Sequence, residues 1–167
     1  MRSSVFYLAP ALHRCGRVQM PMPGGCKLGP RPIDIHLDGL VKMGARVQWQ
    51  GESLTVTAPG GLHGVDYSLR LPSVGATETL LMAAVLAPGQ TVLRGAAAEP
   101  EIADLAAFLT ACGARIRGAG TPLVQVEGVE ALTGATHTPI PDRIVAATLA
   151  AAVASALNGY TGPEVRV

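Results

Sequence analysis

Apolar residues recur at helical spacing in two similar stretches of the chain, which begin near Pro32 and Pro100. Proline fits the first turn of a helix, and the apolar positions after it form one stripe in each stretch. A glycine follows each stripe, at Gly44 and Gly113, where helices commonly end on a residue with positive φ. We therefore predict two amphipathic helices, with apolar positions at Ile33, Leu37 and Leu40 in the first and Ile102, Leu105, Leu109 and Cys112 in the second.

Short β-prone segments follow both predicted helices. Residues 46–49 and 54–57 follow the first, residues 115–117 and 124–127 follow the second, and each pair is joined by a glycine-containing turn. Alanine-rich segments at 3–14, 75–87 and 144–157 predict three further helices. A glycine after each of these helices leads into a short strand, as in Gly16 to Met20 and Gly89 to Leu93. The pattern predicts an α/β fold.

The predicted elements repeat along the chain. Gly44-Ala45-Arg46-Val47 recurs as Gly113-Ala114-Arg115-Ile116, at an offset of 69 residues. Leu62-His63-Gly64 likewise matches Leu132-Thr133-Gly134, at an offset of 70. A period near 70 is too long for a small solenoid repeat and indicates a compact α/β unit that is used several times. Because the terminal copies are incomplete, we expect the chain to be a piece of a larger protein or one partner of a split protein.

Composition excludes several classes of protein. Apolar residues make up 49% of the chain and charged residues 15%, which argues against disorder. A net charge of +1 with 4% aromatic residues argues against nucleic-acid binding. The apolar run 144–157 is too short to span a membrane, and we expect no signal peptide in this chain. Three cysteines fit no zinc pattern, so we expect no metal, and a cytoplasmic protein with reduced thiols.

One loop breaks the repeat and carries a cysteine. The segment from Gly16 to Pro32 is four residues longer than its counterpart, and the extra length lies in the proline- and glycine-rich stretch 21–32. Cys26 has Lys27 and Arg31 as neighbours, and cations beside a thiol lower its pKa and raise its reactivity. The residues alone leave two readings open: a reactive cysteine, or an incidental one in a surface loop. The other two cysteines, 15 and 112, are expected in the core.

Several motifs in order along the whole chain resemble the UDP-N-acetylglucosamine 1-carboxyvinyltransferase family of enolpyruvyl transferases. They are Pro23-Gly24-Gly25-Cys26, Arg31-Pro32-Ile33-Asp34-Ile35-His36, Pro72-Ser73-Val74-Gly75-Ala76-Thr77-Glu78, Glu99-Pro100-Glu101-Ile102 and Ile140-Pro141-Asp142-Arg143-Ile144. The resemblance implies an α/β fold of repeated βαβαββ units, an inside-out α/β barrel that is incomplete in this chain. It also implies that residues 1–140 form about two units of one domain, and that residues 141–167 open a partner domain.

The chemistry that the resemblance implies is transfer of enolpyruvyl from phosphoenolpyruvate to the 3′-hydroxyl of UDP-N-acetylglucosamine, with release of phosphate and no cofactor. This is the first committed step of peptidoglycan synthesis. Cys26 would be the proton donor and the target of fosfomycin. The substrate-binding residues implied are Arg2, Arg31, Pro32, Ile33, Asp34, Ile35, His36, Ser73, Val74 and Gly75, with Glu99, Glu101, Asp142 and Arg143 in support.

Other interpretations compete with some of these assignments. Taken alone, Ser73 reads as a helix N-cap, Glu99 and Glu101 as first-turn carboxylates, and His36 as a solvated helix residue. The family's catalytic base and a Lys-Asn pair have no counterpart here, so we expect the isolated chain to be inactive. The alternative to an enzyme is a non-catalytic remnant that binds a UDP-sugar or a complementary chain, such as the missing remainder of the enzyme. A shikimate 3-phosphate enzyme would lack the Cys26 loop.

Overall fold

The computed structural model describes residues 2–21 and 33–157 of the chain. The chain divides into two compact units, Met1–His137 and Thr138–Val167. Within the described residues, no helix is long and apolar enough to cross a membrane.

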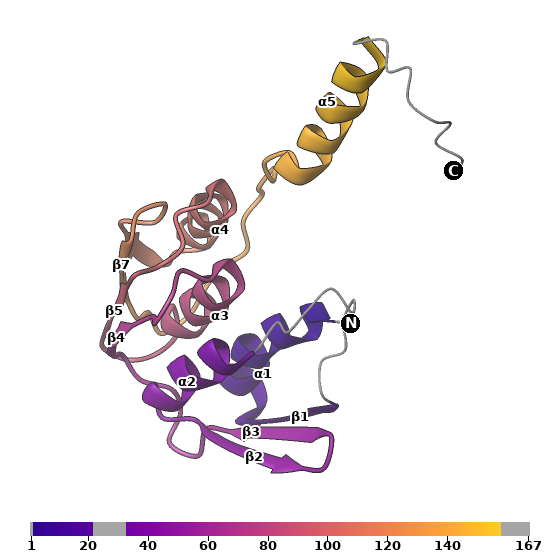
Figure 1. Ribbon diagram of the computed structural model, residues 1–167. Helices are drawn as coiled ribbons and strands as arrows, with labels where there is room; N and C mark the ends of the chain where they lie inside the picture. The colour runs from indigo at the N-terminus through magenta and orange to yellow at the C-terminus, as the bar shows by residue number, and fades with distance from the viewer. Residues whose placement is uncertain (1, 22–32, 158–167) are drawn as a thin grey trace. The chain divides into compact units, whose positions relative to one another are not determined.

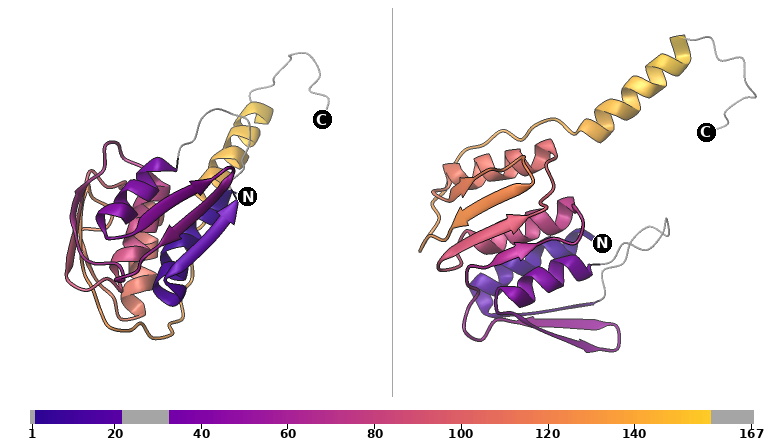
Figure 2. Two further views of the ribbon diagram at one scale, coloured as in Figure 1. Left: turned by 90° about the horizontal axis from the view of Figure 1, so that it is seen from below. Right: turned by 60° about the vertical axis from the view of Figure 1, so that its left-hand side comes forward.

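The first unit consists of two β-sheets with helices packed on one side of them, as Figures 1 and 2 show. Its elements are η1 (Arg2–Tyr7), α1 (Leu8–Cys15), β1 (Arg17–Pro21), α2 (Asp34–Lys42), β2 (Arg46–Gln50), β3 (Ser53–Thr57), β4 (Asp66–Ser68), α3 (Val74–Ala84), β5 (Gln90–Arg94), α4 (Pro100–Ala111), β6 (Arg115–Arg117) and β7 (Leu123–Glu127). Among the described residues, the strand orders are β1-β3-β2 and β4-β5-β7-β6, and neither sheet closes into a barrel. The predicted α/β class is therefore confirmed.

The two sheets display the sequence repeat in three dimensions. In the first sheet, β1 follows the alanine-rich helix and pairs antiparallel with β3, and β3 also pairs with β2. In the second sheet, β5 takes the place of β1: it pairs antiparallel with β7, and β7 also pairs with β6. The elements from β4 to β7 follow the order βαβαββ, and α1 to β3 repeat the last five of these elements. Gly44 and Gly113 end equivalent helices with φ of 102° and 103°. The predicted repeat unit and its period are confirmed.

The core lies between the helices and the sheets, and α3 runs through its centre. Leu80 and Leu81 of α3 are fully buried, as are Leu54 of β3 and Val124 of β7. Cys112 is buried against this core, as predicted. Cys15 was predicted to be buried too, but it is exposed. It is the last residue of α1, so it extends beyond the packed part of the helix stripe.

Local patterns missed two features of the first unit. The strand β4, Asp66–Ser68, is only three residues long and pairs parallel with β5, so alternation over a longer segment does not reveal it. The helix predicted at residues 3–14 begins as the 3₁₀ segment η1 and becomes α-helical at Leu8.

The second unit contains α5, Arg143–Leu157, which matches the predicted alanine-rich helix. Asp142 caps it, because its Oδ1 accepts hydrogen bonds from the backbone N–H groups of Ile144 at 2.8 Å and Val145 at 3.2 Å. Among the described side chains of α5, the large apolar ones of Ile144, Val145, Leu149 and Val153 are exposed.

Candidate functional site

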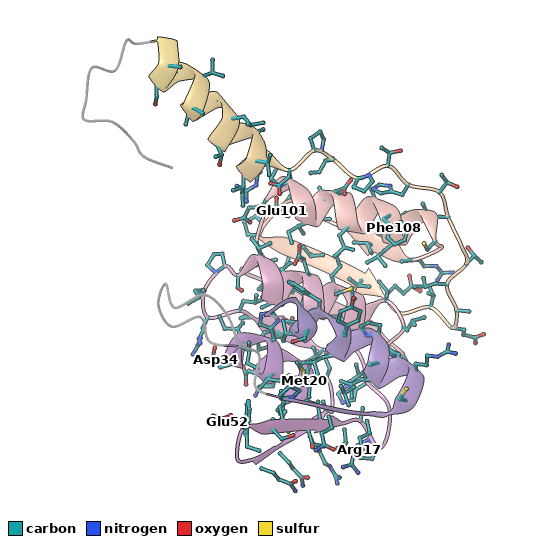
Figure 3. The ribbon with its side chains drawn as sticks, turned by 90° about the vertical axis from the view of Figure 1, so that its right-hand side faces the viewer. Arg17, Met20, Asp34, Glu52, Glu101 and Phe108 are labelled. Carbon is teal, nitrogen blue, oxygen red and sulfur yellow. The ribbon has the colours of Figure 1, made fainter. Side chains whose placement is uncertain are left out.

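The N-terminal ends of α2, α3 and α4 converge at one end of the first unit. His36 of α2 contacts the first two turns of α3, and Gly39, one turn on, lies against Leu80, so α2 and α3 run in the same direction. Just before α4, the backbone N–H of Ala97 donates to Thr77 Oγ1 of α3 at 3.0 Å. Figure 3 shows Asp34 and Glu101 toward the same side of the unit, where α2 and α4 begin. Three helix N-termini with their partial positive charges therefore meet on one face.

His36 is buried between α2 and α3. Only 8% of its surface is exposed, and its Nδ1 shares a hydrogen bond of 2.9 Å with Thr79 Oγ1. Its ring also lies edge-on to Phe6, with ring centroids 6.3 Å apart. The reading of His36 as a solvated helix residue is thus wrong, because α3 and η1 cover the helix face that carries it. His36 locks the start of α2 against the start of α3.

Gly75 allows this close approach. A Cβ at residue 75 would lie 3.1 Å from Cε1 of His36 and 3.4 Å from Cζ of Phe6. Both neighbours belong to packed rings, so a side chain at this position would displace one of them. Gly75 therefore permits the first turn of α3 to lie directly on the His36 ring.

Two carboxylates one turn apart on α2 face the segment that contains β4. Asp34 accepts from Nη2 of Arg70 through Oδ2, and its Oδ1 accepts from the backbone N–H of Ile35 at 3.0 Å. Asp38 accepts from the hydroxyl of Tyr67 at 2.8 Å. Burial, followed by this hydrogen bond, raises the pKa of Tyr67 to about 12, so the phenol remains a donor at neutral pH.

The first turn of α3 is an N-capped helix start. Ser73 has an extended backbone, and its Oγ accepts from the backbone N–H of Ala76 at 3.3 Å. The N-cap interpretation of Ser73 is confirmed, and Val74 and Gly75 are half-buried beside it. Capping and anion binding are compatible, because one side chain satisfies only part of the set of N–H groups at a helix start.

A second pair of acidic side chains lies where α3 and α4 approach each other. Burial, with a smaller contribution from the Glu101 carboxylate, raises the pKa of Glu78 above its ordinary value. Glu101 lies in the first turn of α4 and Glu99 is its N-cap residue, although the Glu99 side chain makes no capping hydrogen bond. The first-turn reading is confirmed for Glu101, and Glu99 lies one position before the helix.

The remaining predicted site residues are distributed as follows. Ile35 is buried in the core, and Ile33 is partly buried against it. Asp142 and Arg143 belong to the second unit. Cys26, Arg31 and Pro32 lie outside the described residues, and Arg2 begins η1. Within the part of the chain that the structure describes, no group of three or more His, Cys, Asp or Glu side chains is placed to hold a metal ion.

The structure adds Arg70, Tyr67, Thr79 and Phe6 to the predicted set. Each contacts a residue of α2 from a distant part of the sequence: Arg70 is 36 positions from Asp34, and Thr79 is 43 positions from His36. No local spacing or repeat links these pairs, so sequence reasoning had no signal for them.

Comparison with known proteins identifies the family of the chain. The sequence model of the EPSP synthase (3-phosphoshikimate 1-carboxyvinyltransferase) family matches residues 1–160. The chain belongs to this family. The predicted membership among the enolpyruvyl transferases is therefore confirmed.

Individual proteins similar to this chain carry more specific names than the family. The chain is 52% identical over its whole length to UDP-N-acetylglucosamine 1-carboxyvinyltransferase 1 of Symbiobacterium thermophilum, and it covers 37% of that protein. It is 50% identical over its whole length to UDP-N-acetylglucosamine 1-carboxyvinyltransferase of Rhodospirillum centenum, covering 38% of it. The crystal structure of the enolpyruvyl transferase NikO from Streptomyces tendae shares the fold, with a TM-score of 0.75 over 89% of this chain and 36% of that one, at 24% identity. The chain thus spans less than two-fifths of the length of these relatives.

Proposed function

We propose that this chain supplies part of the active site of an enzyme that transfers enolpyruvyl from phosphoenolpyruvate to the 3′-hydroxyl of UDP-N-acetylglucosamine. The observation that carries the proposal is the identity of 50% and 52%, over the whole chain, to two proteins with this name. The convergence of three helix N-termini supports it, because both substrates are anionic and such ends favour negative charge. The product would enter peptidoglycan synthesis, so we expect the reaction in the cytoplasm.

In this proposal the described residues bind and orient the nucleotide sugar. The carboxylate of Asp34 accepts a hydrogen bond from the uracil or the ribose, and the first turn of α3, Ser73 to Gly75, faces the diphosphate. His36 keeps these two segments in register, because it is packed between them. These contacts bind the nucleotide away from the reacting atoms. They thereby hold the 3′-hydroxyl of the sugar in position for attack.

The chemical steps would be addition followed by elimination. The 3′-hydroxyl gives its proton to a base from the rest of the enzyme as its oxygen attacks C2 of phosphoenolpyruvate, and an acid adds a proton to C3. A proton then leaves C3 as the C2–O bond to phosphate breaks, which restores the C2–C3 double bond and releases phosphate. Cys26 is proposed as the acid for the first step, with Arg31 holding phosphoenolpyruvate and Arg2 near the substrates. Glu99 and Glu101, with Asp142 and Arg143 of the second unit, would support the site from outside it.

A chimera tests this function. The 167 residues would replace the matching stretch of the Symbiobacterium thermophilum relative, and phosphate release from phosphoenolpyruvate and UDP-N-acetylglucosamine would be measured. We expect turnover by the chimera, loss of several orders of magnitude in rate on Cys26→Ser, and fosfomycin inactivation only when Cys26 is present. A folded chimera without turnover would contradict the proposal and favour a non-catalytic, UDP-sugar-binding chain.

The isolated chain is expected to release no phosphate. It covers less than two-fifths of the relatives, and the family resemblance implies that the catalytic base lies outside its 167 residues. Loss of such groups typically lowers the rate by several orders of magnitude. Ordinary turnover by the isolated chain would show that these residues are sufficient for catalysis.

A further inference from the structure

We propose that Arg70 is an exchangeable partner of Asp34: it holds the Asp34 carboxylate until a nucleotide binds, and it then moves to the diphosphate. The proposal rests on the proposed function, and it adds to the site a residue that the family motifs in this sequence do not include. Arg70 would then be a positioning residue for Asp34 and a direct phosphate ligand.

Both oxygens of the Asp34 carboxylate accept hydrogen bonds in the structure. Oδ1 accepts from the Ile35 backbone at the start of α2, and Oδ2 accepts from the Arg70 guanidinium. A nucleobase or ribose donor that approaches this carboxylate therefore competes with Arg70 for Oδ2. The competition is local, because Ile35 belongs to the same helix end and keeps Oδ1 in either state.

The Arg70–Asp34 ion pair is weak enough to exchange. The side chains of Arg70 and Asp34 are 57% and 49% exposed, and exposed pairs of this kind typically contribute about 0–1 kcal/mol. The neighbouring contact has the opposite character, because Tyr67 is only 7% exposed while its hydroxyl donates to Asp38. One carboxylate of α2 is therefore held by a buried phenol, and the other by a cation that water already reaches.

The alternative partner for Arg70 lies in its own loop. Arg70 precedes the N-cap Ser73 by three residues, between β4 and the first turn of α3. A diphosphate held at the start of α3 would be within reach of the Arg70 side chain. Guanidinium pairs with phosphate through two parallel hydrogen bonds, which a carboxylate with one occupied oxygen does not match. Binding of a diphosphate thus removes the competitor from Asp34 at the moment when the nucleoside needs it.

The two roles of Arg70, positioning Asp34 and binding the diphosphate, are separated by comparing ligands with and without phosphate groups. Binding of uridine, UDP and UDP-N-acetylglucosamine to the 167-residue chain would be measured by calorimetry for the native protein, Arg70→Gln and Arg94→Gln. Arg94 is a matched control, because it pairs with Asp66 on adjacent strands and the two side chains are 53% and 57% exposed. We expect Arg70→Gln to weaken UDP and UDP-N-acetylglucosamine binding about tenfold, the value of one charged phosphate contact, and to leave uridine binding unchanged or tighter.

Three results would overturn the inference. Equal losses for uridine and UDP would mean that Arg70 only positions Asp34, and losses no larger than those of Arg94→Gln would mean that it has no role. Absence of binding of all three ligands by the native chain would also overturn it, because no nucleotide would then be held at these residues to displace Arg70 from Asp34. Phosphate release by the chimera tests the proposed enzymatic function separately, whichever of these results is obtained. Urea unfolding of Arg70→Gln within about 1 kcal/mol of the native value excludes a folding defect.

Discussion

Replacement of Gly39 by alanine tests the contact that brings the N-terminal ends of α2 and α3 together. Gly39 lies in the middle of α2, where alanine normally stabilises a helix by about 1 kcal/mol relative to glycine. A Cβ at this position would lie 2.4 Å from Cδ2, 2.6 Å from Cδ1 and 3.0 Å from Cγ of Leu80. Leu80 is fully buried in α3, so its side chain can move aside only by pressing on other residues of the close-packed core.

The size of the effect follows from these two opposing contributions. Overpacking a core by one methyl group costs typically about 1–3 kcal/mol, so Gly39→Ala should destabilise the chain by about 1 kcal/mol despite the gain in helix propensity. Leu80→Ala alone should cost about 3 kcal/mol, because it leaves a cavity. With Leu80→Ala already present, the methyl group added at position 39 would enter that cavity, and Gly39→Ala should then stabilise the chain by about 1 kcal/mol.

The assay is a double-mutant cycle in urea, followed by circular dichroism. The expected signature is a change of sign, with a coupling of about 2 kcal/mol between positions 39 and 80. Val41→Ala is the control, because Val41 lies on the same helix but is 44% exposed, and its effect should be the same in both backgrounds. If Gly39→Ala stabilises the otherwise native chain, α2 and α3 do not approach as closely as the structure shows.

Burial and charge lead to three further predictions. Because the pKa of Tyr67 is raised to about 12, the free energy of unfolding should fall as pH rises from about 10 through 12, and Tyr67→Phe should abolish that fall in unfolding titrations. The pKa of Glu78 is raised as well, so the stability that its protonated form contributes is present below its ordinary pKa and is lost as pH rises. Glu78→Gln should therefore stabilise the chain at neutral pH and have no effect near pH 4, roughly the pKa in the unfolded chain. Urea unfolding at both pH values measures the difference. In competitive alkylation with peptide mapping, Cys26 should react first because of its cationic neighbours, Cys15 next because it is exposed, and Cys112 only on unfolding because it is buried; labelling of Cys112 in the native chain would contradict its place in the core.

The elements of this protein and their repetition could be predicted from the sequence. Glycines at 44 and 113, apolar stripes at helical spacing and alternating segments are local signals, so helices and strands could be assigned from neighbouring residues alone. The repeat then showed that one α/β unit is used more than once. The motif around Ser73 likewise marked a helix start, because capping depends only on the next three residues.

Which residues meet became known only from the packing of the elements. The parallel pairing of β4 with β5, the burial of His36 against Thr79 and the pairing of Arg70 with Asp34 join positions that are tens of residues apart. The exposure of Cys15 likewise depends on where the neighbouring elements end, although its spacing on α1 resembles that of a core residue. Periodicity reports which face of an element is apolar, but the partner of each side chain depends on how elements distant in the chain pack together.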